Sequence, residues 1–239
     1  LDIYGFMIAG FLIVMGTLGD RIGRRRVLLG GATAFCLASI LAAFSNSAEM
    51  LILSRALLGI AGATLMPSTL ALISNMFKDD RQRTAAIAIW VSGFIVGTAI
   101  GPVIGGIMLE YFWWGSVFLL AVPVMALLLI AGPLLLPEFR QTNAGRLDLY
   151  SVMLCVIAMV FIIFGLKEIA RNGFVLFPLV ILGTGIFFAH IFVGRQNKLT
   201  NPMLELGLFS QRRFRISVTA LLLMLLAFSS AWLMAFQYL

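Results

Sequence analysis

Residues 84–109 read TAAIAIWVSGFIVGTAIGPVIGGIML, a run without a single charged side chain. A helix needs about 20 apolar residues to cross the hydrocarbon core of a bilayer, so this run is long enough to span one. The rest of the 239-residue chain is similar: 62% of its residues are apolar and 11% are charged. Soluble domains are about 25% charged, and a chain of this size cannot hide so much apolar surface from water. These proportions predict an integral membrane protein and exclude a soluble enzyme or a disordered tail.

The apolar runs are continuous rather than alternating, which favours membrane-spanning helices over a transmembrane β-barrel. The predicted fold is therefore all-α, a polytopic bundle with about eight spans. Both cysteines lie inside apolar runs, so a disulfide framework is excluded as well. The predicted spans cover approximately residues 2–19, 27–44, 50–77, 84–109, 111–136, 149–166, 172–194 and 216–239.

Basic side chains fall in every second connector between the predicted spans. The second and fourth connectors hold no Lys or Arg, and the sixth holds only Lys167 and Arg171. The odd-numbered connectors hold all the others except Arg55. Cytoplasmic loops of membrane proteins are enriched in Lys and Arg, so the odd-numbered connectors are predicted to be cytoplasmic and the first span runs inward. The net charge of +7 is thus a topology signal rather than a sign of nucleic-acid binding.

The chain ends and one long connector carry further expectations. The chain starts at Leu1 rather than at Met and stops within an apolar run, so we expect a fragment of a longer protein. The connector from Arg195 to Arg215 is the longest. Within it, residues 202–209 fit either a short amphipathic helix on the membrane surface or an ordinary connector whose leucines reach the interface.

The first candidate functional element is the connector at residues 16–26, GTLGDRIGRRR. Its glycines permit a tight turn between two antiparallel helices. An acid among arginines forms charge-assisted hydrogen bonds, and such a network on one membrane face can make and break as helices move. We predict a cytoplasmic latch here, although an anchor that only fixes topology would have a similar composition. The residues predicted to carry the latch are Gly16, Asp20, Arg21, Gly23, Arg24 and Arg25.

The second candidate is Arg55, a charge within an apolar run. A charge inside a span costs ~2.5–3.5 kcal/mol or more, so Arg55 should face a cavity or a partner, unless it extends to the outer interface. Asp2 lies at the outer start of the first span, at a similar depth. We hypothesise that the two side chains approach one another and that protonation of Asp2 alters their pairing. A solvated acid at the helix end is the open alternative.

The third candidate is a row of glycines spaced by four in the fourth span. Residues at this spacing share one helix face, and glycines there let another helix approach closely. A proline in the same run bends the helix because it removes a backbone hydrogen bond. We predict either a conformational hinge or a plain packing face. The residues concerned are Gly97, Gly101, Pro102, Gly105 and Gly106.

Met66, Trp90 and Phe94 are candidates for lining a substrate cavity, because aromatic faces attract flat cations. A lipid-facing or packing role is the alternative. The sequence contains no phosphate-binding loop, no H-E-x-x-H and no C-x-x-C, which are the motifs of ATP hydrolysis and of common metal sites. We therefore expect no catalytic residues, no metal and no cofactor.

Several of these stretches resemble motifs of the major facilitator superfamily. Residues 16–25 are similar to its loop motif G-x-L-a-D-r-x-G-r-k. Residues 51–63 are similar to l-x-x-x-R-x-x-q-G-x-g-a-a, with Leu58 in place of the usual Gln. Residues 97–106 resemble the antiporter motif g-x-x-x-G-P-x-x-G-G. The resemblance implies that the loop motif locks one end of a transporter and that the arginine takes part in proton transfer.

The resemblance also implies a branch and a domain organisation. The antiporter motif is associated with drug:proton exporters, and the two extra spans fit the fourteen-helix branch, which includes pumps for methyl viologen and quaternary ammonium compounds. On this basis residues 1–136 hold helices 2 to 6 of the N-terminal six-helix half. Residues 137–194 hold two extra linker helices, and residues 195–239 hold the cytoplasmic connector and the first helix of the C-terminal half.

The implied function is proton-coupled export of cationic amphiphilic drugs or biocides across the plasma (inner) membrane by alternating access. The proton gradient would supply the energy, and the protein would not be an enzyme. Its expected partners are the lipid bilayer, cationic substrates and protons, without nucleic acid. A transporter for a metabolite or sugar, against which the glycine–proline motif argues, and a non-transporting membrane scaffold are the alternatives.

Overall fold

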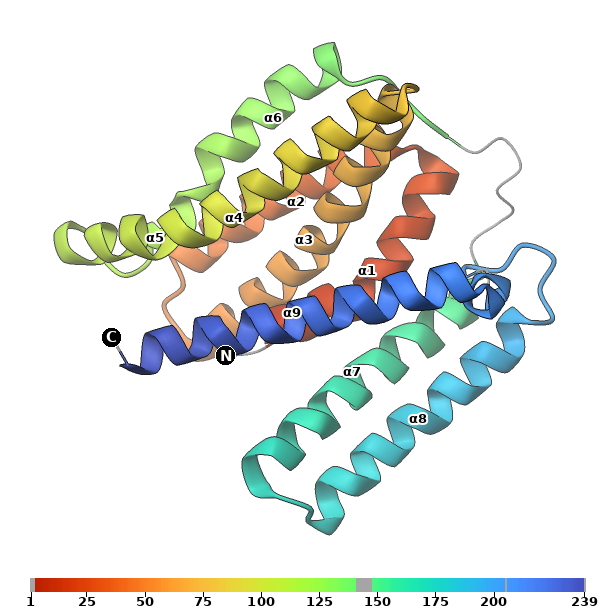
Figure 1. The fold of residues 1–239 in the computed structure, drawn as a ribbon. Helices are drawn as coiled ribbons and strands as arrows, with labels where there is room; N and C mark the ends of the chain where they lie inside the picture. The colour runs from red at the N-terminus through yellow and green to blue at the C-terminus, as the bar shows by residue number, and fades with distance from the viewer. Residues whose placement is uncertain (1–2, 141–147, 205, 239) are drawn as a thin grey trace. The chain divides into compact units, whose positions relative to one another are not determined.

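The computed structural model describes residues 3–140, 148–204 and 206–238. Every regular element within these residues is helical, and eight of the helices are long and apolar enough to cross a membrane. The predicted all-α fold with eight spans is therefore confirmed (Figure 1). In chain order the elements are α1 Ile3–Ile22, α2 Arg24–Ala43, α3 Ala48–Met76, α4 Asp80–Tyr111, α5 Ser116–Leu119, α6 Ala121–Leu135, α7 Leu149–Asn172, α8 Leu176–Gln196, the 3-10 helix η1 Leu206–Ser210, and α9 Arg212–Tyr238.

Polar caps set several helix starts that hydropathy alone does not locate. The Ser47 side chain accepts a hydrogen bond from the Met50 amide at the start of α3. Asp79 accepts from the amides of Arg81 and Gln82, so α4 begins at Asp80, before the predicted start at residue 84. Such side chains satisfy amide groups that the first turn of a helix leaves unpaired. The apolar run marks the part of each helix within the bilayer, and the cap marks the true end.

Helix α3 packs against both α1 and α2, and small residues allow the close approach. A Cβ atom at Gly31 of α2 would lie 1.7 Å from the Thr64 hydroxyl oxygen of α3. A Cβ at Gly59 of α3 would lie 2.6 Å from both the Met7 Cβ and the Tyr4 carbonyl oxygen of α1. Lipid tails are as apolar as leucine, so close packing of small residues rather than the hydrophobic effect joins helices in a membrane. Glycine at these two positions therefore permits the close packing of α3 against α1 and α2.

Glycines also allow the close approach of α6 and α7 to the first helices. Helix α6 approaches α2 at Gly132, and α7 approaches α1 at Gly10, where a Cβ would lie 3.3 Å from Val160 Cγ2. Helices α7 and α8 form an antiparallel pair (Figure 1). Their backbones meet at Gly165 and Gly185. The turn between them contains Gly173, whose φ of +78° is rarely adopted by residues other than glycine.

By its contacts the chain divides into two compact units, Leu1–Phe192 and Val193–Leu239. The second unit contains η1 and α9, and the rings of Phe209 and Phe214 meet edge to face with centroids 5.1 Å apart. Within the connector from Arg195 to Arg215, residues 206–210 form a short 3-10 helix. In the first unit α4 has no buried residue among those described, so most of its apolar surface is open to its surroundings.

Candidate functional site

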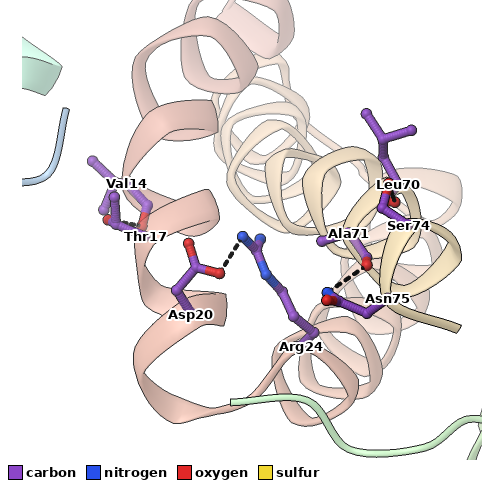
Figure 2. A network of polar contacts seen from close by, with 8 residues as sticks. All are labelled: Val14, Thr17, Asp20, Arg24, Leu70, Ala71, Ser74 and Asn75. Carbon is purple, nitrogen blue, oxygen red and sulfur yellow. Dashed lines mark hydrogen bonds and ion pairs between the residues drawn. The ribbon is translucent and has the colours of Figure 1, made fainter. Parts of the chain in front are cut away.

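A single glycine separates α1 from α2 at the predicted cytoplasmic latch. The Arg24 guanidinium points from the first turn of α2 back to the last turn of α1, where its Nη2 lies 2.5 Å from Asp20 Oδ1 (Figure 2). The Arg24 side chain is only 12% exposed. A Cβ at Gly19 would lie 2.9 Å from Arg24 Cδ, so glycine at that position leaves room for the guanidinium. The structure thus joins Asp20 and Arg24 as a charge-assisted pair.

Arg24 and its neighbour Arg21 keep unused hydrogen-bonding capacity. Arg24 Nε and Nη1 and Arg21 Nη1 are buried without a hydrogen-bond partner among the described residues. Buried guanidinium groups normally pair with acceptors, because an unpaired buried donor costs free energy. The predicted latch therefore has donors that a further acceptor could use. At Gly16, the remaining glycine of the motif, an added Cβ would lie in ordinary contact with Pro67 of α3, 3.7 Å from its Cβ.

Glu138, which the sequence analysis missed, contacts the arginines of the predicted latch from the chain segment after α6. Its Oε1 accepts a hydrogen bond of 3.1 Å from the Arg25 amide, and its Oε2 lies 3.7 Å from Arg26 Nε. The Arg24 amide donates to the Phe139 carbonyl. Glu138 thus caps α2 from a distant part of the chain, where a carboxylate is favoured by the helix dipole. The sequence contains only an indirect indication of this cap: Gly23, the residue before α2, has no side chain that could cap the helix, so the cap has to come from elsewhere.

Arg25 of the loop also binds the end of α6 directly. Arg25 Nη1 donates to the Leu136 carbonyl at 3.0 Å and to the Pro133 carbonyl at 3.4 Å. Cations near the last carbonyls of a helix interact favourably with its dipole. Three helix ends, those of α1, α2 and α6, therefore meet in one polar cluster at the predicted cytoplasmic side.

Arg55 faces a cavity, as a charge inside a span must. A cavity of about 430 Å³ is lined by Arg55 of α3, Tyr4 of α1 and Lys167 of α7. The Arg55 guanidinium carbon lies 5.4 Å from the centre of the Phe118 ring, and Arg55 Nε is buried without a hydrogen-bond partner among the described residues. Asp2 lies outside the described residues, so its approach to Arg55 stays a prediction.

Met66, Trp90 and Phe94 line one cavity. It has a volume of about 470 Å³ and is formed by residues of α1, α2, α3 and α4. Tyr4 and Phe35 line it as well, so aromatic side chains come from three helices, α1, α2 and α4. A cavity of this size, mostly apolar with a few polar groups, is typical of small-molecule sites, and aromatic faces attract cations.

The glycine row of α4 is open. Nothing within the described residues lies within 4 Å of a Cβ placed at Gly97, Gly101, Gly105 or Gly106. Pro102 lies inside α4, which is helical from Asp80 to Tyr111. The close helix contacts of the described chain occur at other glycines, such as Gly31 and Gly59. Whether the glycine row acts as a hinge or as a packing face stays a prediction.

The described chain is thus a polytopic helical membrane protein with eight candidate spans, a charge cluster where α1, α2 and α6 end or begin, and a mostly apolar cavity lined by α1, α2, α3 and α4. The family model of the Major Facilitator Superfamily matches residues 2–239, and the chain belongs to this superfamily. It is a multi-pass protein of the plasma membrane, as predicted.

Curated relatives refine this likeness. The chain is 45% identical over 220 residues to the multidrug efflux pump LfrA of Mycolicibacterium smegmatis, which covers 92% of this chain and 44% of the relative. It is 36% identical to the methyl viologen resistance protein SmvA of Salmonella typhimurium, covering 89% of this chain and 43% of the relative. The predicted resemblance to multidrug and methyl viologen pumps is confirmed. The chain spans less than half the length of these relatives.

A solved structure supports the fold. A peptide transporter, POT, superposes with a TM-score of 0.54 at 24% sequence identity, covering 73% of this chain and 37% of that one. At this identity the likeness concerns the fold alone.

Proposed function

We propose that this chain is part of a secondary transporter that exports cationic amphiphilic compounds from the cell in exchange for protons. The observation that carries the proposal is the cavity in which Met66, Trp90 and Phe94 lie together. Such a lining accommodates the apolar body of an amphiphile, and the aromatic faces attract its charge. The names of the relatives, a multidrug efflux pump and a methyl viologen resistance protein, support the same substrate class.

The proposed mechanism is alternating access, in which helical bundles rock about a central site. The Asp20–Arg24 pair and the Glu138 contacts hold the cytoplasmic end in one state. The glycine row of α4 flexes between states. Protons bind to acids within the membrane, with Asp2 and its hypothetical partner Arg55 as candidates, and bias the equilibrium between states.

We further propose the domain organisation and energy source that the resemblance implies. Residues 1–136 belong to the N-terminal helical half, residues 137–194 to an extra helix pair, and residues 195–239 to the start of the C-terminal half. The protein moves its substrate without chemically changing it, needs no cofactor, and draws its energy from the proton gradient. Lipid, substrate and protons are its partners.

Transport in vesicles tests this proposal. The intact transporter is reconstituted in proteoliposomes, a pH gradient is imposed, and ethidium movement is followed by fluorescence. We expect accumulation that requires the gradient and that falls several-fold in Phe94→Ala. Phe187→Ala, which removes an equally exposed ring on α8, is the matched control and should transport normally. Ethidium movement in the same direction as protons, or none at all, would reject the exporter.

A further inference from the structure

Tyr4 of α1 lines two cavities. The first, called the aromatic cavity from here on, has a volume of about 470 Å³ and contains Met66, Trp90 and Phe94. The second cavity lies beside Arg55, has a volume of about 430 Å³ and reaches α7. Among the described residues, Tyr4 is the only one that lines both. Its side chain is therefore placed to form a wall between two spaces of similar size.

The other lining residues of α1 divide between the two cavities. Ile8 and Leu12 line the aromatic cavity and not the second. Gly5 and Ala9 line the second cavity and not the aromatic one. Residues four apart share one helix face, so each cavity follows its own face of α1. Tyr4 lies where these two faces meet.

Packing against α2 and α3 holds Tyr4 at this boundary. A Cβ at Gly59 of α3 would lie 2.6 Å from the Tyr4 carbonyl oxygen, so the backbones of α1 and α3 meet at this level. Tyr4 also packs against a buried cluster formed by Ala38, Ala42 and Leu58. Side chains in close-packed interiors interdigitate and keep low-energy rotamers. The wall is therefore part of the packed helix core and keeps its position.

The wall limits the space that a ligand of the aromatic cavity can fill. Small-molecule sites have volumes of about 300–1,000 Å³, and the aromatic cavity alone lies in the lower half of this range. Because the two cavities have similar volumes, joining them would nearly double the space. A ligand too large for the aromatic cavity has to push packed side chains apart, which is unfavourable.

We propose that the Tyr4 ring sets the upper size limit of the transported cation, because it closes the aromatic cavity toward the second cavity. The ring rather than the hydroxyl carries this role, so phenylalanine should serve equally well at this position. The proposal rests on the proposed function, since it takes the aromatic cavity to be the substrate site. It adds a specificity-determining residue on α1 to that site.

Binding of two dyes to the intact, detergent-purified transporter tests the size limit. Ethidium and the larger rhodamine 6G are both amphiphilic monocations, and fluorescence anisotropy gives the dissociation constant of each. The readout is the ratio of the two constants, because partial loss of folded protein lowers the binding of both dyes alike. Tyr4→Ala should shift this ratio at least tenfold in favour of rhodamine 6G, whereas Tyr4→Phe should keep the ratio of the parent.

Phe35→Ala is the matched control. Phe35 packs against the same buried cluster as Tyr4 and lines the aromatic cavity, but it does not line the second cavity. Its removal adds only the space of one ring, so the ratio should shift less than threefold. Tyr4→Leu keeps an apolar side chain against the cluster but lacks the ring. It takes the place of Tyr4→Ala if alanine prevents folding.

A further substitution shows whether the larger dye enters the second cavity. Ile163 of α7 lines that cavity and not the aromatic one, so Ile163→Trp fills part of the second cavity alone. Combined with Tyr4→Ala, it should restore the ratio of the parent. On its own it should leave the ratio unchanged, because the Tyr4 ring already keeps the dye out.

Three outcomes would overturn the proposal. The ratio stays at the parent's value in the folded Tyr4→Ala or Tyr4→Leu variant, Phe35→Ala shifts it as far as Tyr4→Ala does, or the shift survives Ile163→Trp. In each case, ethidium binding that Phe94→Ala weakens would leave the proposed substrate cavity standing. A parent protein that binds neither dye would instead reject the substrate cavity, and the size limit with it.

Discussion

Gly23 carries two demands that only glycine meets. Its φ of +123° and ψ of +133° belong to a region that costs other residues about 1–3 kcal/mol. A Cβ there would also lie 2.4 Å from Glu138 Oε1. Gly23 therefore both joins α1 to α2 and leaves room for the Glu138 carboxylate that caps α2.

Gly23→Ala should lower the midpoint of thermal unfolding clearly, because it combines backbone strain with a displaced Glu138. Gly30→Ala is the matched control, since Gly30 is helical and has nothing within 4 Å of a Cβ. Alanine there should be neutral or should stabilise by about 0.5–1 kcal/mol. Equal midpoints for the two variants would contradict the geometry at Gly23.

Glu138→Ala should destabilise the protein by about 0.5–2 kcal/mol, the usual cost of a lost helix cap. Glu138→Gln keeps an acceptor for the Arg25 amide and loses only the charge, so its effect should be smaller. Glu110→Ala serves as the control, because that carboxylate has no hydrogen bond or ion pair in the described structure. Denaturation of the purified protein measures all three. A Glu138→Ala midpoint equal to that of Glu110→Ala would show that the cap contributes nothing.

At the scale of helices, α7 and α8 approach each other closely at Gly165 and Gly185. A Cβ at Gly165 would lie 2.8 Å from the Leu182 nitrogen, and backbone cannot move aside as a side chain can. Gly165→Ala should therefore cost about 1–3 kcal/mol, as overpacking does. Gly183→Ala, on the facing helix with nothing within 4 Å, is its control. Protease sensitivity of the α7–α8 pair reports the difference, and equal sensitivity would argue against a tight contact.

Alanine substitutions in the glycine row of α4 should affect transport without affecting stability. Gly97→Ala and Gly101→Ala meet nothing in the described residues, so the variants should fold as stably as the parent. If the row flexes or is approached during the transport cycle, ethidium export should nevertheless fall. Thermal unfolding and vesicle transport, measured on the same preparations, check this. Unchanged transport by both variants would leave the row without the predicted role.

Sequence and structure agree on what the bilayer itself dictates. Span number follows from the length of apolar runs, because the hydrocarbon core has a fixed thickness. The bonding of Glu138 to the start of α2 depends instead on how the chain returns after α6, which no local pattern encodes. Likewise, Gly31 and Gly59 allow close helix contacts, but no regular spacing of glycines marks them in the sequence. The regularly spaced glycines of α4 predicted a close helix contact, yet nothing in the described residues packs against them. The sequence predicted which kinds of side chain would line a substrate cavity, namely those of Met66, Trp90 and Phe94. Their meeting in one cavity depends on how the helices pack.

At the scale of the whole molecule, the alternation of basic connectors predicts on which side of the membrane each loop lies. In a variant without the native cysteines, Asn46→Cys should react with a membrane-impermeant maleimide in intact cells. Lys78→Cys should react only after permeabilisation. Both positions are exposed, so accessibility to water does not bias the comparison. Labelling of both from the same side would contradict the threading.

The three helix ends gathered around Gly23 have a mechanical consequence. One residue links α1 to α2, and the strand of chain leaving α6 is bonded to the first turn of α2. A tilt of any one of these helices must therefore drag the other two with it. The cluster therefore couples the end of α6 to the first turn of α2 and, through Gly23, to the end of α1.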